Sequence, residues 1–419
     1  MVRDGRHQQP GAGLIRALNS LGPWRSLVAL TLVVLGLYAL VLGISFGLVP
    51  VGPGMTNRLG KTAGGDFAFF YAAGTLASQG QAHLAYQADN LTPVAQTALG
   101  WNGPPLDWAY PPPLLLPLLI LAQLPPGVAL ACWSLGLAGC SMLAGGLGAG
   151  GWRQPPLALA FPGLGFALFT GQFSPMVGLL LGLTLPAYAP SVAGRGMALG
   201  LLVFKPHFAP VPALVALARR DYAMLGIAFV WGGGLALASL WLFGTDTWAA
   251  FFAAGRHHWD LLVTGAAPLG RSASIFGALR TYGVGIQSAM ALHLLGAAAA
   301  VVVCHALARR ATRESVRTLS VIGAALVITP YAFDYDLIYL LIPWAVLIRE
   351  AREGWPVTNA HFALWVALTV VLPGVWLVSL TVPISIGAPA LLGVLLLGLW
   401  ASESDVRPGS ARPSEINAG

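Results

Sequence analysis

Long apolar runs separated by short polar segments dominate the chain. The first run covers about 26–48, which is long enough to cross a bilayer at about 1.5 Å per residue of helix. Further runs cover about 111–124, 128–149, 156–170, 173–188, 195–217, 222–243, 289–309, 316–332, 335–349, 360–380 and 384–400. Some runs are short or interrupted by Pro and Gly. The pattern therefore predicts an all-α polytopic membrane protein with about 10–12 transmembrane helices.

The same pattern divides the chain into three parts. Residues 1–25 form a basic N-terminal tail, 26–400 the membrane domain, and 401–419 a polar tail that we expect to be disordered. The first apolar run is longer than the core of a secretory signal, so we expect an uncleaved first helix. Two larger loops, about 50–110 and 244–288, connect apolar runs on the outer side.

Composition supports a membrane class. The chain is 57% hydrophobic and only 9% charged, whereas about 25% of residues are charged in an average soluble domain. A soluble core of this length could not bury so much apolar surface. The three cysteines lie inside apolar runs without metal-ligand spacing, and we interpret them as packing residues.

The basic residues predict the orientation. The net charge is +7, and Lys and Arg gather in short segments between apolar runs and in both tails. Twelve spans place these groups and both termini in the cytoplasm of a bacterium, and the two larger loops on the periplasmic side of its inner membrane. Arg153 and Arg195 are exceptions, since this span count places them outside.

Asp66 is the best catalytic candidate in the first outer loop. It begins a stretch with helical spacing of apolar residues that includes Tyr71. Asp at such a position is often a helix N-cap. A carboxylate at the outer membrane surface can also act as a general base toward an acceptor hydroxyl. Both interpretations remain open at this point.

Lys205 is an ionisable residue at membrane depth. A lysine at the centre of a transmembrane helix costs about 2.5–3.5 kcal/mol on insertion scales, so it usually faces a partner or a cavity. Pro206 should kink the helix beside it. We expect the ammonium to bind a phosphate, with a snorkelling lysine as the alternative. His207 alone is more typical of a packed histidine.

Other polar candidates lie near the outer ends of spans. Asp334 and Asp336 flank Tyr335 between two apolar runs, where they either cap a helix or serve a functional site. Arg271 and Arg280 lie in the second outer loop, against the positive-inside tendency, which favours anion recognition. His257 and His258 are adjacent and lack a third ligand, so we expect no metal site.

In order along the chain, these motifs resemble family 87 of the glycosyltransferases, over most of residues 26–350. The motifs are Gly65-Asp66-Phe67 with Tyr71, Tyr110-Pro111-Pro112, Gly171-Gln172-Phe173-Ser174, Lys205-Pro206 before Arg219–Arg220, Ser274 with Arg280, and Pro330 with Tyr335-Asp336. One departure concerns the Gly-Gln motif, which Asn often follows in the family. Our span count also places Gln172 on the cytoplasmic side, away from Asp66.

The resemblance implies a GT-C membrane fold and a specific chemistry. The enzyme would transfer a hexose, mannose first among them, from a polyprenyl-phosphate donor to a lipid or glycan acceptor of the cell envelope, with inversion. Asp66 corresponds to the catalytic aspartate of the first loop. We expect Lys205, Arg271 and Arg280 to bind the donor phosphate. Further candidates are Tyr71, Gln172, His207, His258, Tyr335 and Asp336. We expect no cofactor, no metal and no nucleic-acid partner.

Two other functions also fit the sequence. A secondary transporter or lipid flippase would suit many spans and an intramembrane lysine, but the large outer loops and the lack of visible paired halves argue against it. A polymerase or ligase of lipid-linked glycans is the other alternative.

Overall fold

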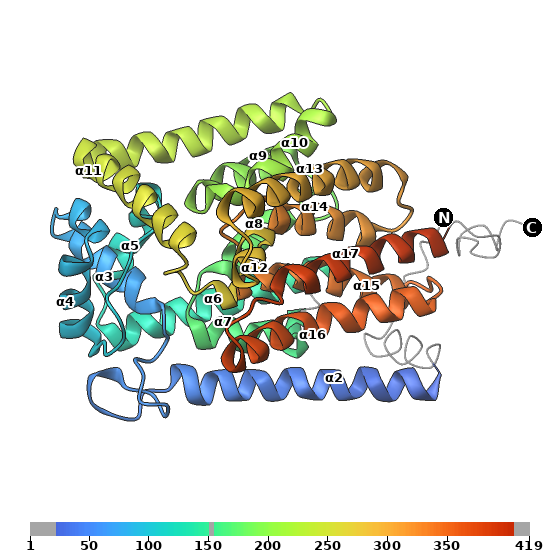
Figure 1. The fold of residues 1–419 in the computed structure, drawn as a ribbon, viewed down its shortest axis with the longest axis horizontal. Coiled ribbons are helices and arrows are strands. Elements are labelled where there is room, and N and C mark those ends of the chain that lie inside the picture. The colour runs from blue at the N-terminus through green and yellow to red at the C-terminus, as the bar shows by residue number, and fades with distance from the viewer. Residues whose placement is uncertain (1–21, 151–154, 406–419) are drawn as a thin grey trace, which may run out of the picture.

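The computed structural model describes residues 22–150 and 155–405, and all structural statements below concern those residues. They form an α-helical bundle, and their β pairing is limited to three isolated bridges. Figure 1 shows long helices packed side by side, with α3, α4 and α5 collected at one end of the bundle. The predicted all-α architecture is confirmed.

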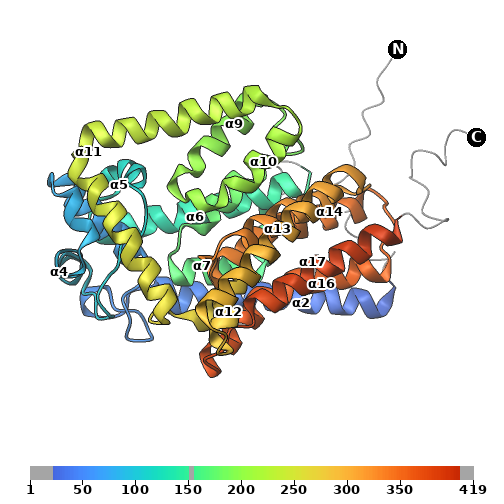
Figure 2. The same ribbon diagram turned by 45° about the horizontal axis from the view of Figure 1, so that its top comes forward.

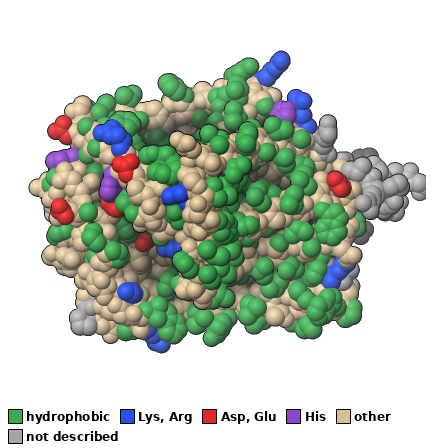
Figure 3. Space-filling model, viewed as in Figure 1, with side chains coloured by type: hydrophobic (Ala, Val, Ile, Leu, Met, Phe, Trp, Pro, Cys, Tyr) green, Lys and Arg blue, Asp and Glu red, His purple; other side chains and the backbone are tan. Residues whose placement is uncertain are grey.

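Six helices are long and apolar enough to cross a membrane. They are α2 (Pro23–Leu42, continued by the π-helical η1, Gly43–Leu48), α6 (Pro126–Gly148), α11 (Tyr222–Thr264), α13 (Ile286–Arg310), α16 (Asn359–Thr381) and α17 (Gly387–Ser404). Large apolar side chains point outward from them: Phe229 is 80% exposed and Trp241 86% exposed. Figure 3 shows apolar side chains across most of one face. Such a surface requires lipid as its solvent, which confirms a polytopic membrane protein.

Shorter elements fill the rest of the bundle. They include α3 (Phe67–Ser78), η3 (Ala82–Tyr86), α4 (Ala88–Leu99), η4 (Pro112–Leu114), α5 (Leu115–Leu121), η5 (Pro155–Ala160), α7 (Pro162–Thr170), α8 (Ser174–Leu183), α9 (Val192–Leu201), η6 (Leu202–Phe204), η7 (Pro206–Phe208), α10 (Pro210–Ala218), η8 (Leu269–Arg271), α12 (Ile275–Thr281), α14 (Glu314–Ile328), η9 (Asp334–Leu340) and α15 (Leu341–Arg352). Several apolar runs of the sequence are therefore broken into pieces too short to cross alone.

Most basic residues lie at one end of the bundle, which we call the basic end, opposite α3. There Arg25 Nη1 donates to the Val357 carbonyl over 2.9 Å, and Arg313 Nη2 donates to the Pro356 carbonyl over 2.7 Å. The loop before α16 thus joins the start of α2 to the start of α14. Arg153, which the span count placed outside, lies outside the described residues.

The run predicted as a single span over 195–217 is instead a hairpin. Helix α9 rises from the basic end, the chain reverses near Lys205 and Pro206, and α10 returns, as Figure 2 shows. Arg195 Nη2 pairs with Asp221 Oδ2 at 3.2 Å, so both ends of the hairpin meet. The prediction that Arg195 lies on the outer side was wrong, because a reversal returns the chain to the side it left.

Helix α5 also differs from the predicted span over 111–124. It has seven residues and packs against α3, so it stays at that end of the bundle. The chain then runs along α6 to the basic end and returns through η5 and α7. Gly171 consequently lies against Gly64. The expectation that Gln172 lies on the opposite side from Asp66 was wrong, because α5 was counted as a full crossing.

The two larger connecting segments are mostly helical. The first contains α3 and α4. In the second, α11 bends at Gly244, whose φ of 78° and ψ of 172° interrupt the helix, and then continues to Thr264. Its second half contacts η3 and η4. The bend therefore lays this half over the end of the bundle that carries α3, as Figures 1 and 2 show.

Helices α2 and α7 pack through glycines. A Cβ at Gly43 would lie 2.2 Å from the Gly165 carbonyl oxygen, and a Cβ at Gly165 would lie 2.4 Å from the Ala39 oxygen. Small residues permit such close backbone approach between membrane helices. This contact fixes α7, and hence its C-terminal turn, against α2.

Gly165→Val should separate α2 from α7 and lower stability by about 1–3 kcal/mol, the usual cost of overpacking. The measurement is the thermal unfolding midpoint of the purified protein in detergent. Gly139→Val is the matched control, because it also lies within a helix and a Cβ there meets nothing within 4 Å. Equal midpoints for the two variants would contradict the packing argument.

Candidate functional site

Two glycine turns bring Asp66 and Gln172 together. Gly64 and Gly65 have φ of 78° and 51°, and Gly171 ends α7 with φ of 67°. A Cβ at Gly171 would lie 1.8 Å from the Gly64 oxygen. The Asp66 N–H donates to the Thr170 carbonyl over 2.8 Å. Because only glycine accommodates both the positive φ and the contact, the two turns can abut directly.

The Asp66 side chain does not cap its own helix. It stands at the N-cap position of α3, but its carboxylate accepts no capping hydrogen bond. Instead, Gln172 Nε2 donates to Asp66 Oδ2 over 2.5 Å. The Tyr110 hydroxyl donates to Gln172 Oε1 over 2.7 Å. The chain of bonds from Tyr110 through Gln172 orients the carboxylate, which removes the capping interpretation.

The surroundings of Asp66 make its carboxyl group a stronger base than usual. Loss of hydration in the fold raises the pKa of Asp66 above its ordinary value; the Gln172 hydrogen bond and the charge of Arg271 lower it, and the charge of Asp334 raises it. The side chain is still partly exposed. A carboxylate with a raised pKa and access to the surface suits general-base chemistry.

Aromatic rings form one wall of the site. Phe70 lies with its ring centroid 5.3 Å from that of Tyr110 and 5.8 Å from that of Phe173. Trp108 and Trp133 extend the cluster, at 5.6 Å and 4.6 Å from Phe70. These contacts lock Tyr110, so its hydroxyl remains aimed at Gln172.

Arg271 and Asp334 form a two-point ion pair beside this network. Arg271 Nε and Nη2 donate to the two Asp334 oxygens over 2.9 and 3.0 Å. An isolated bridge between Ser272 and Phe333 holds the two segments together. The Arg271 side chain is 36% exposed while that of Asp334 is fully buried. Within the described residues Nη1 has no hydrogen bond, so one edge of the guanidinium remains available to an anion.

Lys205, at the apex of the α9–α10 hairpin, is already paired. Its Nζ lies 2.5 Å from Asp336 Oδ1, and both side chains are buried, at 5% and 0% exposure. Ser174 Oγ and the Tyr339 hydroxyl also donate to this oxygen, over 2.8 and 2.9 Å. The ammonium charge of Lys205, which is costly at membrane depth, is thus neutralised by the Asp336 carboxylate inside the protein. The predicted role of Lys205 in phosphate binding stays a prediction.

Tyr335 joins the two ion pairs. Its ring centroid lies 5.0 Å from Lys205 Nζ and 5.9 Å from Arg271 Cζ. A ring face between two cations is a favourable cation–π arrangement. The structure therefore assembles the predicted residues Asp66, Gln172, Arg271, Lys205, Tyr335 and Asp336 into one connected region.

The remaining candidates lie elsewhere or have other partners. The Tyr71 hydroxyl donates to the Leu124 carbonyl over 3.0 Å. Arg280 uses Nη1 and Nη2 to bind the carbonyls of Val284 and Val263. His258 lies on the second half of α11, partly exposed. His207 packs on Phe208 at 4.4 Å between ring centroids, and its Nε2 is buried without a hydrogen-bond partner.

Sequence reasoning missed several members of this region. Tyr110 was noticed only as part of an aromatic-proline motif, although its hydroxyl reaches Gln172. Ser174, two residues after Gln172, donates a hydrogen bond from its hydroxyl to Asp336. No local spacing connects these residues, since 162 positions separate Ser174 from Asp336. As for metals, the described residues contain no group of three His, Cys, Asp or Glu side chains arranged to hold an ion.

Lys205→Met should destabilise the protein by about 3–5 kcal/mol, because it leaves the Asp336 carboxylate buried without a counter-charge. Lys205→Met combined with Asp336→Asn should recover part of that loss. Thermal or denaturant unfolding in detergent would measure both effects, with Lys61→Met on the exposed outer segment as a control. A loss in the double variant equal to the sum of the losses in Lys205→Met and Asp336→Asn alone would show that the pair is not coupled.

Comparisons with known proteins place the chain in one family. No curated protein and no solved structure matches it. The family model for glycosyltransferase family 87 matches residues 108–330, which is more than half of the chain. That segment contains Gln172, Lys205 and Arg271, while Asp66 and Asp336 lie beyond its limits. Most of the motifs that carry the resemblance thus fall inside the matched segment, and the chain belongs to glycosyltransferase family 87.

Proposed function

We propose that this membrane glycosyltransferase transfers a hexose, with mannose as the first candidate, from a polyprenyl-phosphate donor to an acceptor hydroxyl of the cell envelope. The reaction takes place at the periplasmic face of a bacterial inner membrane. One observation carries the proposal. Asp66 is held by Gln172 instead of capping its helix, and it lies close enough to Arg271 for their charges to interact. A base and a cation are thus presented together.

The reaction uses these two groups on opposite sides of the sugar carbon. Asp66 accepts the proton of the acceptor hydroxyl as its oxygen attacks the anomeric carbon. A new carbon–oxygen bond forms while the bond from that carbon to the phosphate oxygen breaks. The lipid phosphate leaves with the electron pair, and attack from the opposite face inverts the configuration. Arg271 stabilises the growing negative charge through the free edge of its guanidinium.

The donor phosphate is assigned first to Arg271. Its side chain is 36% exposed, whereas Lys205 is enclosed with Asp336. We propose that the Lys205–Asp336 pair holds Tyr335 and the apex of the hairpin in place. Arg280, whose two Nη groups bind carbonyls, would instead order the segment that carries Arg271.

The location and the family membership favour a lipid-linked donor. The region lies at the end of the apolar bundle that carries α3, which the proposed orientation makes the outer end; there a lipid anchor would remain in the bilayer while its phosphate meets Arg271. Cationic side chains can neutralise such a phosphate without a metal. The transporter, flippase and polymerase alternatives lose support, because the chain belongs to a glycosyltransferase family.

Asp66→Asn should reduce transfer by about 10²–10⁴-fold, the range for loss of a general base. The assay supplies purified protein in lipid with radiolabelled polyprenyl-phosphate mannose or glucose and an envelope lipid extract. Asp107→Asn is the control, since Asp107 is an exposed carboxylate whose contact is His257 at 3.8 Å. Equal transfer by wild type and Asp66→Asn would remove Asp66 from catalysis.

Gln172→Leu should move the acidic limb of the pH–rate profile to higher pH. Transfer requires ionised Asp66, so activity falls as pH drops through its pKa. The Gln172 hydrogen bond lowers this pKa, and its loss leaves burial to raise the pKa further. Initial rates across pH would be compared with those of Gln123→Leu, an exposed amide bonded to its own helix. An unmoved limb, or one moved to lower pH, would contradict the assignment.

A further inference from the structure

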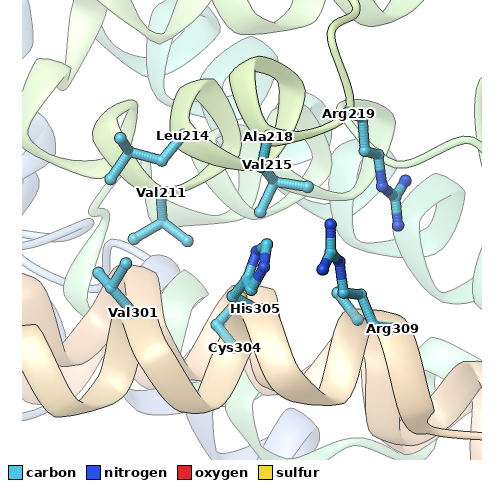
Figure 4. A pocket seen from close by; sticks show the side chains of 10 residues that line it. Val211, Leu214, Val215, Ala218, Arg219, Val301, Cys304, His305 and Arg309 are labelled. Atoms are coloured by element: carbon cyan, nitrogen blue, oxygen red, sulfur yellow. The ribbon is translucent and has the colours of Figure 1, made fainter.

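A groove lies between α10 and α13 at the basic end of the bundle, on the far side from Asp66. Its enclosed part has a volume of about 80 Å³. Figure 4 shows the side chains of the two helices facing each other across the gap. The groove takes no part in the proposed transfer reaction, so it calls for a separate explanation.

The two helices present matching rows of side chains. Val211, Val215 and Arg219 recur at intervals of four on α10, and Val301, His305 and Arg309 recur likewise on α13. Figure 4 shows both rows running in the same direction, from valine to arginine. At about 1.5 Å per residue each row extends about 12 Å, close to the depth of one leaflet's hydrocarbon. The groove is therefore apolar inside and cationic at its mouth.

Among residues 22–150 and 155–405, the cations at the mouth have no protein counter-ion. Within the part of the chain that the structure describes, neither the Arg219 nor the Arg309 guanidinium makes a hydrogen bond or an ion pair. Asp221 follows Arg219 closely in sequence, but its carboxylate is engaged by Arg195 and by the Met224 N–H. Figure 4 shows both guanidinium groups directed into the gap from opposite helices. Like charges that converge in this way repel each other unless an anion lies between them.

The position fits a lipid of the inner leaflet. The basic end of the bundle is the cytoplasmic end by the positive-inside rule. Basic pockets between membrane helices on that side are suited to anionic headgroups, whose phosphate accepts bidentate bonds from arginine. The apolar side chains below them, Val211 and Val215 on α10 and Val301 on α13, offer a surface for an acyl chain. The groove therefore offers cations to the headgroup phosphate of such a lipid and an apolar surface to its acyl chain.

We propose that this groove binds one anionic glycerophospholipid of the cytoplasmic leaflet, with its phosphate between Arg219 and Arg309 and an acyl chain along Val211 and Val215 of α10 and Val301 of α13. The bound lipid bridges α10 to α13 and so supports the hairpin that carries Lys205. The inference concerns binding alone and stands independently of the transfer reaction.

The test is native mass spectrometry of the purified full-length protein, titrated in detergent with dioleoyl phosphatidylglycerol. Wild type should retain one lipid, and Arg219→Gln with Arg309→Gln should weaken retention at least about tenfold, as expected from loss of two charge-assisted contacts. Arg220→Gln with Arg256→Gln removes the same charge away from the groove and should bind like wild type. Val215→Trp, which fills the groove without changing charge, should also lose the lipid.

Several results would overturn the proposal. Equal retention of phosphatidylglycerol by wild type and the Arg219/Arg309 variant would mean that the arginines only orient the helices. Equal retention of phosphatidylcholine would make the groove a general hydrophobic surface. Preferred retention of a polyprenyl phosphate would exclude a glycerophospholipid as the natural occupant. Tryptophan-fluorescence melting of each variant establishes that it is folded, so that loss of lipid is not mistaken for loss of structure.

Discussion

The contact between two glycine turns is the constraint on which the rest of the site depends. Gly64 and Gly171 approach so closely that a side chain on Gly171 would overlap the Gly64 carbonyl oxygen. That approach brings the start of α3 against the end of α7, which are far apart in sequence. It places the Gln172 amide within reach of Asp66, and it frees the carboxylate from capping its own helix. A carboxylate held by a neighbouring element keeps its orientation even if the first turn of its helix frays.

The second organising feature is the pairing of charged side chains inside the bundle. Lys205 and Asp336 neutralise each other inside the protein, while Arg271 is paired with Asp334 yet remains partly exposed. The two pairs share Tyr335 as a common wall. One pair is thus suited to holding structure and the other to meeting a charged group from outside. Lys205 and Arg271, which the sequence analysis assigned to the same role, therefore have different surroundings.

The sequence predicted the class of protein well because hydrophobic length is a local property. The apolar runs identified a helical membrane protein, and the polar residues within or beside them identified most of the candidate site. Topology was harder, because it depends on whether a run crosses or turns back. The run over 111–124 contains a seven-residue helix beside α3, and the run over 195–217 reverses at Lys205. These two errors placed Gln172 and Arg195 on the wrong sides. The contact of Tyr110 with Gln172 depends on packing of distant elements, which no spacing encodes.

The hairpin formed by α9 and α10 also has a consequence for where chemistry takes place along the membrane normal. Its rising arm, α9 with η6, covers residues 192–204, a length of about 20 Å at about 1.5 Å per residue. A bilayer core is about 30 Å thick. An apex that starts from one interface and rises by this length stops about 10 Å short of the other. The floor of the polar region therefore lies below the headgroups. Under the proposed function, a lipid-anchored phosphate that binds Arg271 above this floor has to sink below the interface, or the bilayer has to thin around the site. Under that proposal, bilayer thickness becomes a variable of the reaction, since it sets how far a lipid-linked donor must travel to reach a fixed depth.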